Sequence, residues 1–184
     1  KKAHKNYDII SKFIKLNKIE TKNSIPTFYL IHHWSPHWPY VFNTDCSLRF
    51  ENEADNIVNY DGYQSAYKCA LKKINKFLDY INERDANAIV VIQGNHGMID
   101  FKKNDYADLE MTFSIFNAIK INKTCQEKLK LVKGNINSLR LILSCPFGIK
   151  NKLIKEKNYV AFYERQKDYG KIIPLEKYKK IKKK

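Results

Sequence analysis

The sequence predicts an α/β domain in which helices cover both faces of a doubly wound sheet. Residues 88–93 form an apolar run without polar alternation, which is typical of strands covered on both faces. Residues 60–81 repeat apolar side chains at helical spacing. The predicted order is strand, loop, helix, strand, strand, helix, which is an α/β layout.

The first predicted elements are a helix and a strand. Residues 5–17 place apolar side chains near helical spacing, so we expect a helix there. Residues 27–32 form a short apolar run after Pro26, and they predict a buried strand. Residues 33–45 contain Pro36 and Pro39, which indicates a loop.

The clearest helix covers residues 60–81. Its apolar side chains step by three and four residues: Tyr60, Tyr63, Tyr67, Leu71, Ile74, Leu78 and Ile81. Three lysines, Lys68, Lys72 and Lys76, lie on the other side. Residues 85–87 end this helix, and residues 88–93 then form the second predicted strand.

The later part of the chain predicts two further strands and a short helix. Residues 113–121 are a third apolar run and predict a strand. Residues 137–144 predict a short helix with Asn137 or Ser138 as its N-cap. Residues 159–163 are a late strand candidate, and residues 177–184 predict a disordered polar tail.

The size and composition of the chain fit one globular domain. It has 184 residues and is 43% hydrophobic, with 12 Tyr and 10 Phe, which is enough for a packed core. We find no internal repeat and no Gly/Ser linker, so residues 1–184 are expected to form a single partial domain. The sequence has no apolar run near the ~20 residues of a membrane span, and its first residues do not resemble a signal peptide.

The formal net charge of +15 can indicate nucleic acid or anionic lipid as a partner. The lysines are scattered, however, and the densest group is at residues 177–184. No zinc-finger, helix-turn-helix or RNA-recognition signature accompanies them. We therefore favour solvated lysine faces and do not expect nucleic-acid binding.

The four cysteines, Cys46, Cys69, Cys125 and Cys145, do not form a Cys-x-x-Cys pair, which argues against a structural zinc knuckle. Four cysteines allow three disulfide pairings, and the sequence does not choose among them. Free buried thiols fit the sequence equally well.

Three histidines, His32, His33 and His37, follow the predicted strand at residues 27–32. The carboxyl end of such a strand is where ligands bind in open α/β sheets. Pro36 and Pro39 stiffen the loop, which can therefore present imidazoles to an anion or a metal. An aromatic surface loop with hydrogen-bonded histidines explains the segment equally well.

A second polar loop, Gly94-Asn-His-Gly97, follows the predicted strand at residues 88–93. The glycines allow a sharp turn and a close approach to a ligand. His96 suits a metal or a phosphate, whereas Asn95 is a weaker metal ligand than a carboxylate. This short motif alone favours an ordinary strand-to-helix turn. A doubly wound sheet, however, would bring both loops to one edge.

The order of these segments resembles a known family. The strand ending in His32 is followed by Pro-His-Trp-Pro-Tyr-Val-Phe at residues 36–42, and the next helix begins with Tyr60, Gln64 and Tyr67. Gly-Asn-His-Gly at residues 94–97 stands where the family has Ser-Asp-His-Gly. Phe-Ser-Ile-Phe-Asn-Ala-Ile and Asn-Ser-Leu-Arg-Leu-Ile-Leu follow at residues 113–119 and 137–143. This order resembles sulfatase-like domains of the alkaline phosphatase superfamily, especially the branch of membrane sulfatases and phosphoethanolamine transferases.

The resemblance implies an alkaline-phosphatase-like sheet and a metal-dependent hydrolase or transferase of phosphate or sulfate esters. In this family a metal-activated Thr, Ser or modified Cys attacks the ester. The matching positions make Asn95 and His96 ligands of a divalent metal (Zn, Mn or Ca). They make His37 and His96 catalytic residues, and His32, His37 and Tyr40 substrate-binding residues. The substrate would carry a lipid headgroup or a glycan, at the extracytoplasmic face of a membrane.

Two departures from the family pattern modify these expectations. Asn95 replaces the metal-binding Asp, so metal binding is expected to be weakened or lost. The family's nucleophile and first acidic ligand precede the matched segments, so this chain is expected to hold the later part of the domain. It would then be inactive without the upstream part. The alternative is a catalytically degenerate relative with a binding role.

Overall fold

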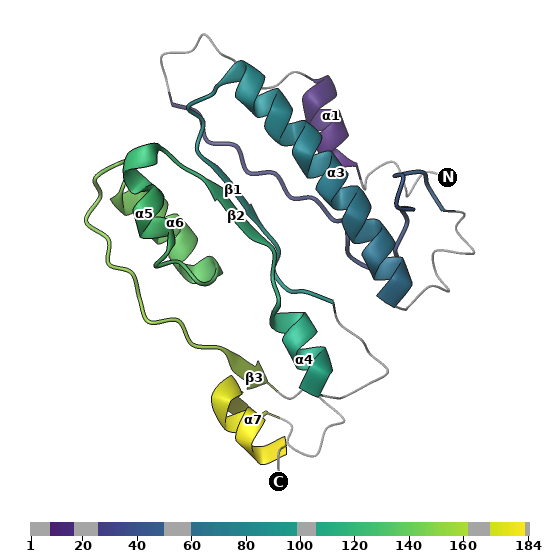
Figure 1. Ribbon diagram of the computed structural model, residues 1–184, viewed down its shortest axis with the longest axis vertical. Helices are drawn as coiled ribbons and strands as arrows, with labels where there is room; N and C mark the ends of the chain where they lie inside the picture. Colours follow the sequence, from purple (N-terminus) through teal and green to yellow (C-terminus); the bar gives the residue numbers. More distant parts are fainter. Residues whose placement is uncertain (1–7, 17–25, 50–59, 99–105, 162–169, 183–184) are drawn as a thin grey trace. The chain divides into compact units, whose positions relative to one another are not determined.

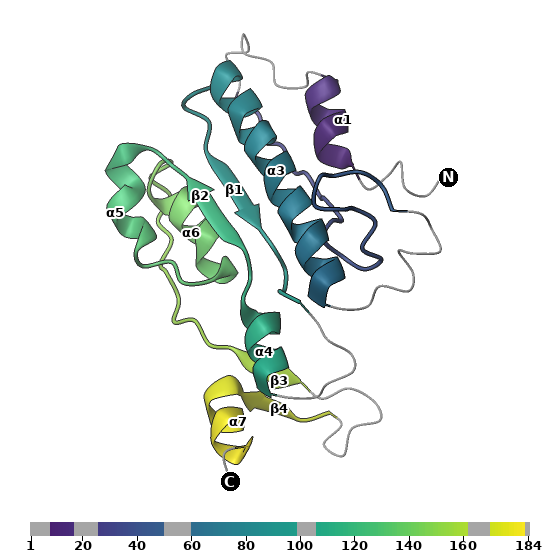
Figure 2. The ribbon, with the colours of Figure 1, turned by 45° about the vertical axis from the view of Figure 1, so that its right-hand side comes forward.

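The computed structural model describes residues 8–16, 26–49, 60–98, 106–161 and 170–182 (Figure 1). The chain divides into two compact units, Lys1–Ala88 and Ile89–Lys184. Figure 2 shows the same elements turned by 45°.

Two helices that lie side by side form the scaffold of the first unit: α1 (Ile9–Lys15) and α3 (Tyr60–Arg84) (Figure 1). Asp8 caps α1, because its Oδ1 accepts a hydrogen bond of 3.2 Å from the backbone N–H of Ser11. Both helices are predicted by the sequence, and both are confirmed within the described residues.

The most buried side of α3 is shifted from the predicted one, and of the predicted apolar residues only Ile81 is fully buried. The buried residues are Gly62, Ala66, Cys69, Ala70, Lys73, Tyr80 and Ile81. Tyr63 and Tyr67 are only half-buried at the edge of this face, and Tyr60 is exposed. Four of the buried residues have small side chains, which let neighbouring segments approach the helix closely. The three lysines predicted to face solvent, Lys68, Lys72 and Lys76, are exposed.

The strand predicted at residues 27–32 is not formed, because this segment has no strand partner among the described residues. Phe28 is 81% exposed and Leu30 is 86% exposed. An apolar run alone does not make a strand, since a strand also needs a neighbour that satisfies its backbone hydrogen bonds. The prediction of a loop at residues 33–45 is confirmed.

A disulfide between Cys46 and Cys69 ties the following loop to α3. The loop doubles back through an isolated antiparallel bridge between Phe42 and Leu48. Val41 and Phe42 pack with Cys69 in the small core of this unit. The segment at residues 32–45, which we call the aromatic loop, is therefore anchored covalently just beyond the predicted substrate-binding residues.

The second unit begins with β1 (Val90–Gln93), which pairs antiparallel with β2 (Asn117–Lys120) so that Gln93 lies opposite Asn117. Half-buried and exposed residues alternate along β1, and Val91 is 37% exposed. The expectation of a strand covered on both faces is therefore wrong for β1. The strand predicted at residues 113–121 is also shorter than expected, because β2 begins only at Asn117 and α4 (Tyr106–Phe113) includes the first residue of the run.

Helical segments and a second disulfide form the core of this unit. They are η2 (Lys123–Cys125), α5 (Gln126–Leu129) and α6 (Asn135–Ser144). The disulfide joins Cys125 to Cys145, next to the buried side chains of Leu141 and Ile142. All four cysteines are thus disulfide-bonded, and none is free.

The helix predicted at residues 137–144 is confirmed, but it begins earlier, at Asn135, with Gly134 as its N-cap. Asn137 and Ser138 do not cap it. Their side chains are 2% and 0% exposed inside the helix, where they make tertiary hydrogen bonds. Asn and Ser at a helix start suggest a cap, but the same side chains also serve buried polar networks.

The last elements are β3 (Tyr159–Ala161), β4 (Ile172–Pro174) and α7 (Leu175–Lys182). β3 pairs antiparallel with β4 and confirms the first part of the strand predicted at residues 159–163, while residues 162–163 lie outside the described residues. β4 and α7 were not predicted. α7 extends through most of the expected polar tail, and residues 183–184 are not described.

The fold is thus mixed α/β, with helices and small antiparallel sheets. The described residues do not form the expected doubly wound sheet, because both sheets have two antiparallel strands and a doubly wound sheet is mostly parallel. In the part of the chain that the structure describes, no helix is long and apolar enough to cross a membrane.

Candidate functional site

The rings of His32, Trp34 and His37 lie together in the aromatic loop of the first unit. The Trp34 ring centroid is 5.9 Å from that of His32 and 4.6 Å from that of His37. Both histidines are exposed, and Trp34 is 45% exposed. Two of the predicted substrate-binding residues therefore share one exposed aromatic neighbour.

The conformation of His37 is set by contacts within its own turn. Its backbone N–H donates a hydrogen bond of 2.8 Å to the Trp34 carbonyl oxygen. Its Nδ1 contacts the carbonyl oxygen of Trp38. A carbonyl oxygen can only accept, so this contact assigns the proton of a neutral ring to Nδ1 and the basic lone pair to Nε2.

Tyr40 is buried rather than presented to solvent, with 5% of its surface exposed. Its ring packs edge-on against Tyr63 of α3, with centroids 6.0 Å apart. Tyr63 in turn stacks on Tyr67 at 5.9 Å. Burial, together with the three neighbouring tyrosines, raises the pKa of Tyr63. Tyr40 thus anchors the aromatic loop, and its substrate-binding role stays a prediction.

The second candidate loop, Gly94 to Gly97, is held to the backbone at both ends. The Gly94 N–H donates to the Phe116 carbonyl oxygen at 2.8 Å, and the Gly97 N–H donates to the Thr112 carbonyl oxygen at 2.7 Å. Asn95 is exposed and His96 is half-buried. His96 Nδ1 lies 2.6 Å from the Gly97 carbonyl oxygen, so His96 has the same assigned tautomer as His37.

Gly97 is required by close packing. A Cβ at this position would lie 1.9 Å from the Met111 carbonyl oxygen and 2.8 Å from that of Ser114. Both oxygens belong to the backbone, which cannot move aside cheaply. At Gly94, by contrast, the nearest atom to such a Cβ would be 3.5 Å away, an ordinary contact. The loop is therefore pressed against residues 111–114 at its His96 end.

Polar side chains from β1, β2 and α6 form a network beneath this loop. Gln93 Nε2 donates to Ser138 Oγ at 2.6 Å and lies 3.2 Å from Asn117 Oδ1. Asn135 Nδ2 donates to the Gly94 carbonyl oxygen at 2.7 Å. Asn135 Oδ1 is buried and has no hydrogen-bond partner among the described residues. The network ties the start of the loop to the first turns of α6.

The residues around His96 supply only part of a metal site. Asn95 and His96 offer one amide oxygen and one imidazole, whereas zinc sites use three or four protein ligands and calcium sites use more. Within the described ranges, no group of three or more His, Cys, Asp or Glu side chains is placed to hold a metal. The Gly97 carbonyl oxygen orients the ring of His96, as backbone carbonyls do for many metal-binding histidines.

No known family, curated protein or solved structure matches this chain. The site residues are therefore assigned from the sequence pattern and their geometry alone. His32 and His37 lie together in the first unit, and Asn95 and His96 are adjacent in the second.

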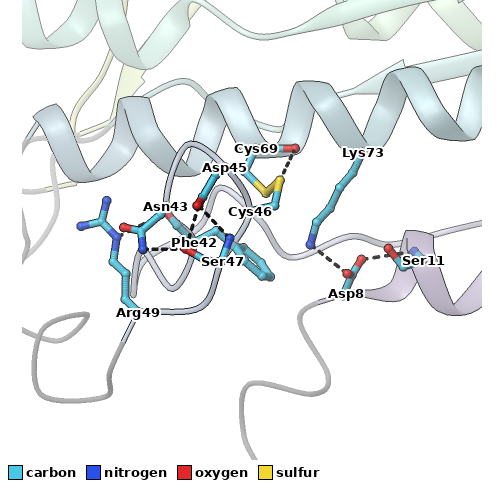
Figure 3. The surroundings of a disulfide bond; sticks show 10 residues. All are labelled: Asp8, Ser11, Phe42, Asn43, Asp45, Cys46, Ser47, Arg49, Cys69 and Lys73. Carbon is cyan, nitrogen blue, oxygen red and sulfur yellow. Dashed lines mark hydrogen bonds and ion pairs between the residues drawn. A yellow bond between two sulfur atoms is a disulfide. The ribbon is translucent and has the colours of Figure 1, made fainter.

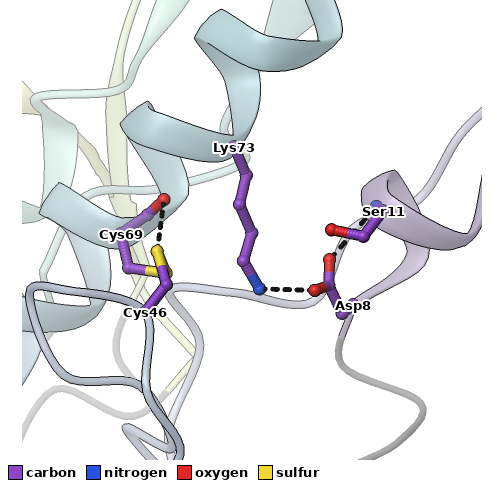
Figure 4. Close-up of polar contacts among 5 residues, drawn as sticks. All are labelled: Asp8, Ser11, Cys46, Cys69 and Lys73. Atoms are coloured by element: carbon purple, nitrogen blue, oxygen red, sulfur yellow. Dashed lines mark hydrogen bonds and ion pairs between the residues drawn. A yellow bond between two sulfur atoms is a disulfide. The ribbon is translucent and has the colours of Figure 1, made fainter. Parts of the chain in front are cut away.

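A buried ionic cluster in the first unit was missed by the sequence interpretation (Figures 3 and 4). Lys73 extends from α3, and its Nζ lies 2.9 Å from Asp8 Oδ2 and 3.6 Å from the centroid of the Phe42 ring. Only 8% of the Lys73 side chain is exposed. Its charge is thus shared between a carboxylate and an aromatic face.

His33 titrates in the field of this cluster. Burial, together with the positive charge of Lys73, lowers the pKa of His33 to about 4. Neither of its ring nitrogens has a hydrogen-bond partner among the described residues. Burial raises the pKa of Asp8, but hydrogen bonds from Lys73 and Ser11 and the charge of Lys73 outweigh this and hold it below its usual range. His33 is therefore neutral at pH 7 and, unlike His32 and His37, is packed inside the unit.

One signal in the sequence pointed to Lys73. Lys73 follows Cys69 and Ala66 at helical spacing, so it shares their buried face. Gln93, Asn137 and Ser138 lie at the ends of apolar segments, where a turn or a helix cap is the ordinary explanation, so no comparable signal marked their hydrogen bonds. Which partners they contact depends on the fold, and the sequence did not reveal it.

Proposed function

We propose that this chain is part of a metal-dependent hydrolase or transferase that acts on phosphate or sulfate esters. It would belong to a sulfatase-like domain of the alkaline phosphatase superfamily. The observation that carries the proposal is the order of four sequence segments, at residues 36–42, 94–97, 113–119 and 137–143. In the complete domain, β1 and β2 would be part of a doubly wound sheet.

In this proposal the aromatic loop binds the anionic group of the substrate. The rings of His32 and His37 both contact the ring of Trp34. Both histidines are exposed, which supports access by a ligand. The assigned tautomer of His37 places a basic lone pair on Nε2, and protonation there would give a second donor for an ester oxygen. His37 would then bind the substrate anion or protonate the leaving group.

The loop from Gly94 to Gly97 would contribute to the metal site. His96 would bind the ion through Nε2 and Asn95 through its amide oxygen. A bound metal would neutralise the charge that develops on the ester and lower the pKa of the nucleophile. The backbone hydrogen bonds of Gly94 and Gly97 support this role, because they restrict the positions of the two ligands.

The proposed location is the extracytoplasmic face of a membrane. Two disulfides support it, since disulfides persist in oxidising compartments and are rare in the cytosol. The substrate would be a lipid headgroup or a glycan carrying a phosphate or sulfate ester.

The metal assignment is tested by calorimetric titration of the chain with Mn²⁺, Zn²⁺ and Ca²⁺. Asn95→Asp restores a full charge and should tighten binding about tenfold or more, whereas His96→Ala should abolish it. Asn122→Asp is a matched control, because Asn122 is exposed and its oxygen would still accept from Thr124. Affinities that Asn95→Asp and His96→Ala leave unchanged would contradict the assignment.

A second candidate function is a catalytically degenerate relative that binds a glycan or a lipid headgroup, and Asn95 favours it. The two functions predict different effects of Asn95→Asp on turnover, measured with the protein as it is produced in the cell. An active enzyme should gain turnover of an aryl phosphate or sulfate along with metal affinity. A degenerate relative should gain metal affinity without turnover.

A further inference from the structure

The helix α6 is apolar on two opposite sides. Its inner side buries Leu141 and Ile142 in the core of the second unit. Its outer side carries Ile136 and Leu139, which are 56% and 57% exposed, together with the half-buried Leu143. These three residues are spaced three, four and seven apart and share one face. Neighbouring apolar side chains that stay exposed often mark an interaction site, so this outer face is a candidate docking surface.

The segment at residues 149–156 runs antiparallel beside α6, and hydrogen bonds fix its position. The Ile149 N–H donates to the Leu143 carbonyl oxygen at 3.0 Å. One turn earlier on the helix, Arg140 donates to Asn151 Oδ1 at 2.9 Å and to the Lys152 carbonyl oxygen at 3.2 Å. The residues of this segment therefore flank the apolar face.

A pair of contacts from Asn137 holds the far end of the segment. Its Oδ1 accepts from the Ile154 N–H at 3.0 Å, and its Nδ2 donates to the Ile154 carbonyl oxygen at 2.8 Å. Glu156 turns toward the same side chain, with Oε1 2.8 Å from Asn137 Nδ2. The single carboxylate of this segment is therefore engaged with α6.

The remaining charged residues of the segment are lysines, and they are exposed: Lys150, Lys152 and Lys155. Together with Ile136, Leu139 and Leu143 they make up what we call the α6 surface. It combines apolar side chains of α6 with exposed lysines of the segment that runs beside the helix, so it is complementary to a partner that is apolar inside and anionic at its surface.

We propose that the α6 surface docks onto an anionic lipid membrane. Ile and Leu would enter the boundary between headgroups and acyl chains, while the lysine ammonium groups stay at the level of the phosphates. Lysine is depleted in protein interfaces, and their hot spots are rich in Trp, Tyr and Arg rather than Leu. A second copy of the chain is disfavoured because each carries a net charge of +15. This inference does not depend on the proposed enzymatic function.

Vesicle co-sedimentation of the full chain tests the proposal. Binding is expected to vesicles of phosphatidylcholine with phosphatidylglycerol, and to be much weaker with phosphatidylcholine alone. Ile136→Ser with Leu139→Ser should lower partitioning about tenfold or more. Each of Lys150→Gln and Lys152→Gln should lower it about fivefold, in a salt-dependent way.

Matched controls on other surfaces separate this site from general charge and hydrophobicity. Ile172→Ser removes an aliphatic side chain that is 69% exposed on β4, and Lys68→Gln removes an exposed lysine of α3. Neither should change partitioning more than about twofold if the α6 surface is the membrane contact. Circular dichroism of every variant checks that the fold is retained.

Three results would overturn the proposal. The first is no binding to anionic vesicles, and the second is equal losses in the control and α6 variants. The third is a dimer, seen by sedimentation equilibrium, that Ile136→Ser with Leu139→Ser dissociates while vesicle binding stays unchanged. That result would assign the α6 surface to a second copy of the chain.

Discussion

Asn135 donates a hydrogen bond of 2.7 Å from its side-chain amide to the backbone carbonyl oxygen of Gly94. The first residue of α6 thereby fixes the first residue of the loop that carries Asn95 and His96. Gln93 strengthens the connection through its bond of 2.6 Å to Ser138. The position of the candidate metal ligands consequently depends on residues some forty positions later in the chain.

Asn135→Ala should loosen this loop. Removing the amide leaves the Gly94 carbonyl without this donor, and we expect a loss of about 1–2 kcal/mol in the free energy of unfolding. Hydrogen exchange at residues 94–97 should become faster, and denaturant titration measures the stability. Asn122→Ala, at an exposed site, is the control. Unchanged exchange at residues 94–97 would show that Asn135 does not hold the loop.

Gly97→Ala should be strongly destabilising, because the added Cβ would lie 1.9 Å from the Met111 carbonyl oxygen. We expect a loss of about 3 kcal/mol, since backbone atoms must move to relieve the overlap. Gly94→Ala, in the same loop, meets only ordinary contacts and should cost about 1 kcal/mol or less. Equal midpoints for the two variants in urea unfolding would argue against this packing.

The ion pair between Asp8 and Lys73 should be worth much more than an exposed one. Asp8→Asn leaves a buried ammonium without its carboxylate and should cost about 3 kcal/mol. The double variant Asp8→Asn with Lys73→Met should cost less than the sum of the single variants. Thermal unfolding of all four proteins completes the cycle.

The exposed pair between Lys130 and Glu127 is the matched control for this cycle, because their side chains are 74% and 83% exposed. Lys130→Met should cost less than about 1 kcal/mol. A coupling energy between Asp8 and Lys73 that is no larger than the cost of Lys130→Met would contradict the role given to the buried pair.

His33 should make the chain less stable in mild acid. Its folded pKa of about 4 lies below its ordinary value of 6.5, so the unfolded state binds a proton more readily. The contribution of His33 to the free energy of unfolding is therefore complete above pH 6.5, and it is lost as the pH falls toward 4. Allowing for partial exposure, we expect a loss of roughly 2 kcal/mol across this window.

His33→Gln should flatten this pH dependence, whereas His32→Gln, at an exposed position, should leave it intact. Urea unfolding at pH 7 and at pH 4 measures the difference. Asp8 loses its own contribution only as the pH falls below 3.8, so it does not account for the window above pH 4. A His33→Gln variant with the same pH dependence as the unmodified chain would contradict the prediction.

The sequence predicted the elements whose pattern is local. The spacing of apolar residues in α3 and α6 is a property of each helix alone, and both were found. The segment at residues 27–32 failed as a strand because pairing depends on another segment. The disulfide partners of Cys46 and Cys125 could not be chosen either, since distance in the fold decides them.

The candidate site was predictable only in part, for the same reason. His32 and His37 are close in sequence, and the structure places them around Trp34. The hydrogen bond between Gln93 and Ser138 joins residues 45 positions apart, and no local sequence pattern predicts it. Likewise Asp8 and Lys73 meet only because α1 packs on α3.

The central claim is that this chain contributes His37 and His96 to a metal-dependent enzyme acting on phosphate or sulfate esters. Its most direct test is the hydrolysis of para-nitrophenyl phosphate and sulfate by the protein as it is produced in the cell, with Mn²⁺, Zn²⁺ or Ca²⁺ supplied. The account predicts turnover that a chelator abolishes and that His37→Ala and His96→Ala each lower about 100-fold or more, while Lys68→Gln leaves it unchanged. Absence of turnover with every metal, or turnover that His96→Ala does not affect, would contradict it.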